Sequence, residues 1–557
     1  MQAELVLTNG NVYVADPRHS ACEALAATAG RIVAVGSNDD VLPLVGRQTQ
    51  VIELDGRLVL PGFIDSHAHA SETALELFGV RLQGLASLEE YLAAVRSFCR
   101  DHPELPVISG SGWSNVVVPG RGPTVAALDA AVADRPALLV SEDGHSLWAN
   151  SAALRRAGIG PDTPDPANGL IERDPSDGSP SGTFREGAQQ LIRGVIPPFT
   201  ANQYVEAIRH FQRTVAGPLG ITTVFDPMLI AGAPVFEAYE QLQRDDALTV
   251  RFRAALWLRS ELPVDEQLEA AAVERERHTG ALFEADAVKL FADGVIEGHT
   301  AFLDEPYADT PGDRGFPEWP AGELAAASVA AARRGFELHY HAIGDAGTAA
   351  ALDAIAAVRA AGMHGGRPAI THVQLVRAGD IARFAELGVT AVLNPYWFLK
   401  DDYFYELQLP YLGRRRAEHE YPMASFFAAA VPVASASDFP VTVPPDPLTA
   451  IQAGVMRWLP GEAAPGDVLW PKECVTVEQM VDSFTIAGAR ALGLERETGS
   501  LEVGKSADLI VLDNDILAAP ATEIASTKVL LTILRGEEVY RDGAFAGSTD
   551  PPSDAAK

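Results

Sequence analysis

Hydrophobic and polar positions follow one pattern at the two ends of the chain and another in its middle. Short apolar runs between turn residues fill the first sixty positions, as in ELVLTNG and RIVAVGS, and they return near the end in LEVGKSADLIVLD. Such runs indicate β-strands, and the TNGN stretch between LVL and VYV predicts a hairpin. We expect residues 1–58 and 491–550 to form one small β-sandwich, with 551–557 as a frayed tail.

The middle of the chain alternates apolar strands with alanine-rich helical segments such as AGELAAASVAAARRG. The strand candidates are, in order, LVLPGFIDSHAH, GITTVFDP, RFRAALWL, DAVKLFADG, FELHYHAIGD, PAITHVQL, VTAVLNPYW and VPVASASDFP. This alternation predicts an α/β fold, a (β/α)8 TIM-like barrel over residues 59–490. In such a barrel the chemistry is expected at the C-terminal ends of the strands.

One connection is far longer than the others. The first and second strand candidates are separated by about 150 residues, well beyond an ordinary loop between a strand and a helix. We expect a cap inserted after the first barrel strand, at about residues 72–215. Long insertions of this kind near strand ends often serve as lids over a site.

Charge and composition narrow the range of partners. Of the 557 residues, 43 are basic and 75 acidic, which gives a formal net charge of −32. Such a surface repels nucleic acid and anionic membranes, so a small-molecule substrate is the expected partner. The three cysteines lack CxxC spacing, and no run of about 20 apolar residues or basic leader is present. We therefore expect a cytoplasmic protein without a disulfide framework.

Histidines occupy the end of the first strand candidate. His67 and His69 are two positions apart, and positions i and i+2 share one face of a strand, so both imidazoles can point into the barrel mouth. Imidazole suits zinc and neighbouring divalent ions. Taken alone, the pair is better explained by two packed or surface histidines.

The fourth strand candidate ends at Lys289, between apolar residues. A lysine is costly to bury without a partner. One interpretation is a salt bridge to Asp293 or Glu297. The other is an amine made reactive by desolvation, which takes up carbon dioxide as a carbamate and bridges two metal ions.

The remaining strands complete a set of candidate ligands. His341 ends the fifth strand, with His339 one layer deeper, supporting the ligand or lining the site, while His372 ends the sixth and Asp438 follows the eighth. Together these side chains would suffice for a mononuclear or dinuclear hydrolytic centre. The predicted set of metal ligands is His67, His69, Lys289, His341, His372 and Asp438.

The same segments carry a family resemblance. GFIDSHAH, KLFADG, HAIGDAG, THVQ and SDFP resemble, in order, the motifs of the amidohydrolase superfamily, and GITTVFDP, GHSLWANSAAL and LEVGKSADLIVLD extend the similarity over nearly the whole chain. The branch it looks like is the amidohydrolase 3 type, which contains N-substituted formamide deformylase and many uncharacterised metal-dependent hydrolases. The resemblance implies a metal-bearing barrel with a β-sandwich built from both termini.

The resemblance also implies roles for individual residues. Four histidines, His67, His69, His341 and His372, would be metal ligands, Lys289 would be the carboxylated bridge if two ions bind, and Asp438 would be the catalytic aspartate. The chain departs from the family pattern after Gly294, where small and basic residues usually precede Thr-Ala. Here the stretch reads VIEGHTA, and His299 within it is an extra ligand, a substrate contact or a loop histidine facing the pocket.

These roles predict a metal-dependent hydrolase that cleaves a carbon–nitrogen bond in an amide or an N-substituted formamide. One or two divalent ions, zinc first among them, would supply a metal-bound hydroxide for the attack. Asp438 would act as general base and then as general acid. The metal, with His145 or His341, would stabilise the developing oxyanion.

Two other classes of function are compatible with the same residues. One is a lyase, decarboxylase or isomerase that uses the metal and Asp438 without a water nucleophile. The other is a non-catalytic metal-binding or regulatory protein, which the complete ligand set disfavours. A homodimer is also compatible with a barrel of this kind.

Candidates for the substrate pocket come from the inserted cap and the strand loops. Aromatic residues there would form an apolar wall, although about half of such residues are packed in the core of ordinary proteins. His145 is a further candidate, whose alternative is a histidine near a helix start beside Asp143 and Asn150. The predicted substrate contacts are Trp113, His145, Trp148, His299, Phe302, Tyr396 and Trp397.

Overall fold

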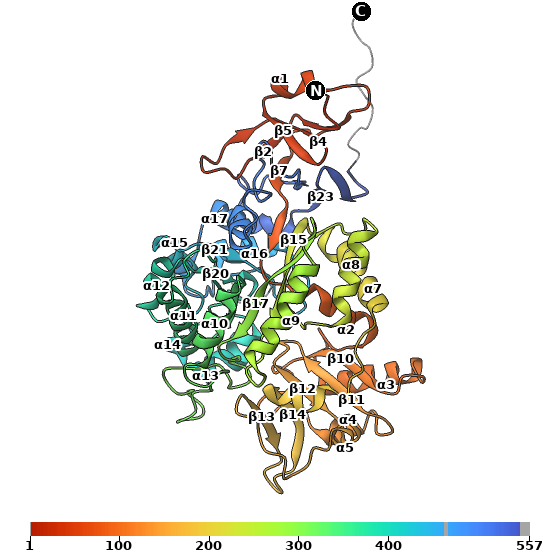
Figure 1. Cartoon of the computed structure of the whole chain (residues 1–557), viewed down its shortest axis with the longest axis vertical. Helices are drawn as coiled ribbons and strands as arrows, with labels where there is room; N and C mark the ends of the chain where they lie inside the picture. The colour runs from red at the N-terminus through yellow and green to blue at the C-terminus, as the bar shows by residue number, and fades with distance from the viewer. Residues whose placement is uncertain (1, 462–465, 546–557) are drawn as a thin grey trace, which may run out of the picture.

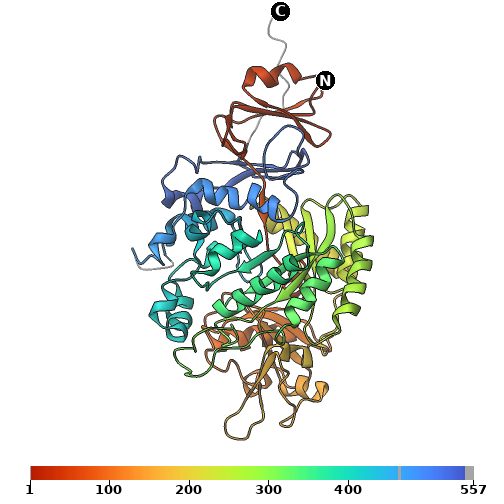
Figure 2. The same cartoon turned by 60° about the vertical axis from the view of Figure 1, so that its left-hand side comes forward.

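Three β-rich parts follow one another along the long axis of the molecule (Figures 1 and 2). The computed structural model describes residues 2–461 and 466–545. Strands from both chain termini form one end, a barrel occupies the middle, and an inserted sheet forms the other end. The predicted tail at 551–557 lies outside the described residues.

The central sheet has eight parallel strands, and its order confirms the predicted barrel. The strands are β8 (Phe63–Asp65), β15 (Ile221–Leu229), β16 (Arg251–Trp257), β17 (Phe283–Phe291), β18 (Glu337–Ala342), β19 (Ala369–His372), β20 (Thr390–Leu393) and β21 (Val433–Ser435). They are buried almost throughout, which explains why they read as near-continuous apolar runs rather than alternating ones.

Helices cover the barrel on its outside, as the alanine-rich segments predict (Figure 1). Several begin and end at recognisable signals. The helix α12 (Asp380–Leu387), for example, ends at Gly388, whose φ of 65° is the left-handed conformation that glycine tolerates best. The covering helices include α7 (Ala201–Phe211), α8 (Pro234–Arg244), α9 (Val264–Arg277), α10 (Glu323–Arg333), α11 (Asp345–Ala360), α12 and α16 (Pro447–Met456).

The seam between the first and last barrel strands is closed just beyond their ends. Ser66 N–H donates to the Ser435 carbonyl at 3.2 Å, and Asp438 N–H donates to the His67 carbonyl at 2.8 Å. The carboxylate of Asp65 accepts from Ser437 N–H at 3.0 Å across the same seam. The segments that carry His67 and Asp438 are therefore tied directly to each other.

Strands from both termini pair in the sheets opposite the inserted domain. One sheet has the order β5 (Arg31–Gly36), β4 (Ala24–Thr28), β1 (Leu5–Thr8), β6 (Gln50–Glu53). The other has the order β24 (Glu537–Arg541), β23 (Val529–Leu534), β22 (Leu509–Leu512), β7 (Leu58–Pro61), β2 (Asn11–Tyr13), β3 (Ala21–Cys22). Side chains from both sheets share one hydrophobic cluster.

Two local predictions in this region are wrong. The strands β1 and β2, expected to form a hairpin, lie in different sheets, because β1 pairs with β4 and β6 while β2 pairs with β3 and β7. The run LVLPGFID is not one barrel strand, because β7 belongs to the terminal sheet and only β8 enters the barrel. Gly62 separates them, and a Cβ there would lie 2.3 Å from the Thr222 side chain.

The long connection after β8 carries its own sheet. Its order is β13 (Gly169–Arg173), β14 (Pro180–Glu186), β12 (Ser146–Ala149), β11 (Ala137–Ser141), β10 (Ile108–Trp113), β9 (Val80–Arg81). This sheet follows the C-terminal end of β8, so it lies over the end of the barrel where the candidate ligands are expected (Figure 1). No helix in the described part of the chain is both long and apolar enough to cross a bilayer.

A buried ion pair joins the terminal sheets to the barrel. Arg251 at the start of β16 donates to Asp508 at 2.8 Å, and their side chains are 3% and 0% exposed. Burial alone would raise the pKa of Asp508, but the charge of Arg251 and hydrogen bonds from Ser506 and the Arg535 N–H hold that pKa below its usual value.

Replacing Asp508 by asparagine is expected to lower the free energy of unfolding by about 3–5 kcal/mol, since Arg251 would stay buried without its counter-charge. The loss is largest above the ordinary aspartate pKa of about 3.9. It shrinks as the pH falls through the lower folded-state pKa, because the wild-type pair is then broken as well. Denaturant unfolding at several pH values measures it.

Glu497 supplies the control. It also reaches Arg251, at 3.7 Å, but is 36% exposed. Glu497→Gln should cost less than about 1 kcal/mol. Equal losses for both variants would contradict the importance assigned to the buried pair.

Candidate metal centre

Three side chains from the closed seam of the barrel form a buried cluster. The Nε2 atoms of His67 and His69 lie 3.3 Å and 3.2 Å from Oδ1 of Asp438. One potential ligand atom from each residue lies within 4.8 Å of the other two. Both histidines follow β8, and Asp438 follows β21, so the contacts across the seam bring them together.

Lys289, in the C-terminal half of β17, points at this cluster. Its Nζ lies 3.2 Å from His67 Nε2 and 4.8 Å from the centre of the Phe291 ring. It forms no ion pair with Asp293 or Glu297 in the described structure, so that interpretation of the sequence is wrong. Burial lowers the pKa of Lys289 to about 7, although the charge of Asp438 opposes the shift.

His341 and His372 complete the ring of imidazoles. Their ring centroids are 4.7 Å apart, and His372 lies 5.2 Å from His67. His372 Nδ1 contacts Oδ1 of Asn394 at 2.9 Å, and His341 Nε2 contacts the Gly294 carbonyl at 3.2 Å. Each ring therefore keeps its other nitrogen without a partner among the described residues, as a metal ligand requires.

Protonation within the cluster also suits a cation. Burial lowers the pKa of His67, His341 and His372, the last to about 4, so these imidazoles are neutral at pH 7. Burial alone would raise the pKa of Asp438, but the contacts with His67 and His69 hold it well below its usual value. Burial would lower the pKa of His69, but its hydrogen bond to Asp438 and the charge of Glu72 raise it. Neutral imidazoles at the other three positions, beside the Asp438 carboxylate, are donors for a divalent ion.

The backbone is unusual at two of these positions. His372 has a φ of 74° and Asp438 a φ of 59°, in the left-handed region that costs about 1–3 kcal/mol for residues other than glycine. Such conformations persist where the surrounding structure fixes them, and they gather at functional sites.

Two neighbours of the cluster support it without facing the cavity. His339 Nε2 contacts His67 Nδ1 at 2.7 Å, so the deeper histidine of β18 supports His67 rather than His341. Asp65, the first polar residue of the GFIDSHAH segment, accepts from the N–H groups of His67 and Ser437. Its role is to hold the two ligand-bearing segments in register.

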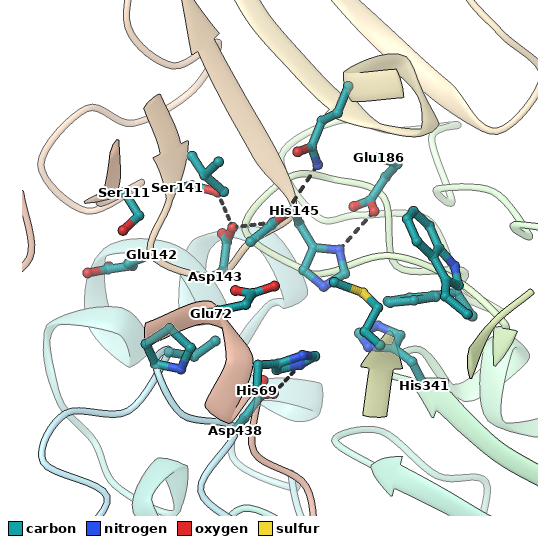
Figure 3. Close-up of a pocket in the computed structure, with 18 of the residues that line it drawn as sticks. His69, Glu72, Ser111, Ser141, Glu142, Asp143, His145, Glu186, His341 and Asp438 are labelled. Atoms are coloured by element: carbon teal, nitrogen blue, oxygen red, sulfur yellow. Dashed lines mark hydrogen bonds and ion pairs between the residues drawn. The ribbon is translucent and has the colours of Figure 1, made fainter. Parts of the chain in front are cut away.

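The inserted sheet contributes a histidine to the opposite side of the site (Figure 3). His145 Nδ1 lies 2.8 Å from Oε2 of Glu186, whose other oxygen accepts from the Thr300 hydroxyl at 2.6 Å. The His145 ring lies 4.9 Å from the ring of His341. Burial opposes protonation, but the charges of Glu186 and Asp143 outweigh it and raise the pKa of His145 to about 9.

Two cavities meet at the cluster, since His341, His372, Asp438 and His145 line both. The smaller, of about 100 Å³, lies between the inserted sheet and the barrel mouth. The larger, of about 450 Å³, extends under the loops after β20 and β21. Residues of the inserted segment line both cavities, and those that line the larger one lie in the loop between β11 and β12.

Three of the predicted substrate contacts lie on these cavities. His145 lines both, and Tyr396 and Trp397 line the larger. Trp397 stacks on His372 with centroids 5.4 Å apart, and its indole N–H donates to the Thr442 hydroxyl.

The other four predicted contacts lie away from both cavities, so these predictions are wrong. Trp113 and Trp148 are fully buried in the core of the inserted domain, where their indole N–H groups donate to the carbonyls of Leu139 and Thr124. His299 pairs with Asp309 beside two tyrosine rings. The Phe302 N–H donates to the Asp293 carboxylate, and the Phe302 carbonyl accepts from N–H groups at the start of α11. None of the four lines either cavity.

Sequence reasoning missed Glu186 and Asn394. Asn394 directly follows β20, so the rule that polar residues at strand ends face the site would have found it. Glu186 gave no such signal, because its position depends on the pairing of β14 with β12, in which Glu186 N–H donates to the His145 carbonyl.

Comparison with known proteins adds an independent line of evidence. A family model described as the amidohydrolase family matches residues 50–540. The chain is 30% identical to Protein LONG AFTER FAR-RED 3 of Arabidopsis thaliana, over 97% of this chain and 92% of that protein. It is 28% identical to N-substituted formamide deformylase of Arthrobacter pascens, over 96% and 97% of the two chains.

Among solved structures, the fold is similar to that of an uncharacterized metal-dependent hydrolase from Pyrococcus furiosus. The TM-score is 0.69 at 27% identity, covering 92% of this chain and 99% of that one.

Proposed function

Because this chain belongs to the amidohydrolase family, we propose that it is a metal-dependent hydrolase cleaving a carbon–nitrogen bond other than a peptide bond, in an amide or an N-substituted formamide. The observation that carries the proposal is the buried convergence of His67, His69 and Asp438 at the barrel mouth. The similarity to N-substituted formamide deformylase and to a metal-dependent hydrolase supports it.

The donor set fits a divalent cation, with zinc the best match to its imidazoles. His67, His69 and Asp438 would hold one ion, and His341 and His372 would hold a second if two bind. Lys289 would then join them as a carbamate, formed when its neutral Nζ adds to carbon dioxide and releases a proton. A bound ion of this kind polarises a carbonyl and lowers the pKa of coordinated water.

Asp438 is placed to move the proton in the reaction. Its contacts with His67 and His69 both fall on Oδ1, and Oδ2 has no partner among the described residues. The low pKa keeps the carboxylate ionised, so it can accept a proton from the attacking water. The same oxygen would return that proton to the leaving nitrogen.

His145 is placed to bind the carbonyl oxygen as it gains negative charge. The Nδ1–H group of the His145 imidazolium donates a hydrogen bond to Glu186, which leaves Nε2–H free to donate to the substrate. A charged donor fixed before the reaction stabilises a developing oxyanion. Glu186 acts here as a positioning residue for His145.

Replacing His145 by alanine is expected to lower kcat by about 10²–10³-fold, the usual effect of losing one such donor. Glu186→Gln should lower it less, and the double variant should lose no more than His145→Ala alone, because the two residues act as a unit. Steady-state kinetics on all three proteins measures this. Additive losses would show that they act independently.

An exposed pair in the same domain gives the matched control. His102 and Glu104 lie 3.4 Å apart, at 44% and 66% exposure, away from both cavities. Glu104→Gln should leave turnover unchanged.

The reaction class is tested with a panel of N-substituted formamides and amides on zinc-reconstituted protein. The proposal expects equimolar amine and carboxylic acid from at least one compound. A lyase or isomerase would convert substrate without releasing this pair of products, and that outcome would reject hydrolysis.

A further inference from the structure

The larger cavity is an aromatic chamber that opens on the candidate metal ligands. His341, His372 and Asp438 form one end, and the chamber runs from there beneath the loops after β20 and β21. Four aromatic side chains line it: Tyr396, Trp397, Tyr403 and Tyr421. A volume of about 450 Å³ is in the range of small-molecule sites.

The charges that line this chamber are mostly negative. No lysine or arginine is among its lining residues. Apart from the candidate ligands, His145 is the one lining histidine, and Glu186 already neutralises it. The lining carboxylates are Glu142, Asp143, Glu297 and Asp401.

Three of these carboxylates have partners within the protein, and Asp401 is one of them, since it accepts from the Phe404 N–H at 3.0 Å. Glu142 accepts from the Tyr403 hydroxyl, and Asp143 accepts from the Asn115 amide at 2.9 Å and from the Ser141 hydroxyl. By contrast, the Glu297 carboxylate contacts its own backbone N–H and forms no hydrogen bond or ion pair with any other described residue. Burial raises the pKa of Glu297 to about 7, and the charge of Asp143 adds to the shift.

Two further polar groups in the chamber lack protein partners. Tyr421 is 1% exposed and Gln408 is 6% exposed, and both line the cavity. Neither the Tyr421 hydroxyl nor the Gln408 amide forms a hydrogen bond to another described residue. Glu297 is partly exposed, and all three side chains line the cavity, so a ligand in the chamber can reach them and supply hydrogen-bond partners.

We propose that the chamber binds a cationic nitrogen of the substrate, an ammonium or a guanidinium group, with Glu297 as its counter-charge. This rests on the proposed function, and it specifies the substrate as an N-acylated or N-formylated amine that carries a second, positively charged nitrogen.

The chemistry of the lining fits this group better than the alternatives. An ammonium has three N–H donors and no acceptor, and Glu297, Tyr421 and Gln408 each offer an acceptor oxygen. The aromatic rings add cation–π attraction. Away from His145 and the candidate metal ligands, a carboxylate or phosphate would meet the negative charges of the lining, and a purely apolar group would leave Glu297 without a counter-charge.

The smaller cavity on the other side of the cluster is also lined mostly by negative charges. Its lining carboxylates include Glu72, Glu76, Glu186, Glu261 and Glu318, against Arg193 and Lys289 as its cationic side chains. Together with the net charge of −32, this lining attracts cations toward the barrel mouth.

The test compares N-(5-aminopentyl)formamide with N-hexylformamide, which match atom for atom except that an ammonium replaces the terminal methyl. Zinc-loaded protein should prefer the cationic compound in kcat/KM by about tenfold or more, the usual effect of a charged hydrogen bond. Glu297→Gln should remove most of that preference, and Glu297→Asp should keep part of it. Glu89→Gln, with a glutamate 78% exposed on the surface, is the control for net charge and should keep all of it.

Binding is measured separately by calorimetry on the zinc-loaded Asp438→Asn protein, with and without Glu297→Gln. Binding of the cationic compound that depends on Glu297 supports the proposal, even if neither compound is hydrolysed, in which case the proposed function alone fails. Absence of Glu297-dependent binding of the cationic compound overturns the proposal, whatever the turnover.

Discussion

Replacing Asp438 by asparagine is expected to lower turnover by about 10²–10⁴-fold, the usual contribution of a group that moves the proton in the transition state. Asparagine keeps the shape of the side chain and one carbonyl oxygen, so the contacts of His67 and His69 with the ligand atom survive. It cannot accept the proton of the attacking water. We therefore expect the loss in kcat, with the metal content per chain nearly unchanged.

Two measurements on the same protein separate this from unfolding or loss of metal. Elemental analysis gives the ion content, and thermal unfolding gives the stability. Asp309→Asn is the matched control, because Asp309 pairs with His299 on the barrel surface and lines neither cavity. Full turnover by Asp438→Asn would remove this residue from the mechanism.

Removing divalent ions is expected to abolish activity almost completely, since in the proposed mechanism the bound ion lowers the pKa of the attacking water. Dialysis against a strong chelator, followed by exchange into metal-free buffer, gives the depleted protein. Zinc should restore the activity, and calcium should not, because calcium binds oxygen ligands rather than imidazoles.

The same ions should raise the unfolding temperature, because a ligand that binds only the folded state stabilises it. This rise should disappear in His67→Ala. Ion binding at exposed carboxylates would not depend on His67. Activity that survives exhaustive depletion would contradict the proposed use of metal.

The barrel and the convergence of its candidate ligands are predictable from sequence for one physical reason. Parallel strands buried on both faces are continuous apolar runs, and their C-terminal ends lie at one end of the barrel. Polar residues directly after such runs, as at His372 and Asp438, therefore gather in space even though they are far apart in the chain.

The features that the sequence did not reveal depend on long-range pairing. The strands β1 and β2 look like a hairpin, yet each pairs with a distant strand, because two sheets share the N-terminal segment. Glu186 faces the site only because β14 lies beside β12. Local pattern contains no information on either pairing.

Aromatic residues were the least predictable part of the site. Trp113 and Trp148 were predicted to form a pocket wall, but they fill the core of the inserted domain. Tyr396 and Trp397 follow β20 at the barrel mouth, and they do line the larger cavity. Position just after a barrel strand distinguished the two cases, and residue type did not.

The most direct test of the central claim is anomalous diffraction from crystals of the zinc-loaded protein, recorded on both sides of the zinc absorption edge. The account predicts a peak in the buried space between His67, His69 and Asp438, within coordination distance of their Nε2 and carboxylate atoms, and a second peak beside His341 and His372 if two ions bind. Crystals of active, zinc-loaded protein with no anomalous peak at this cluster would contradict it.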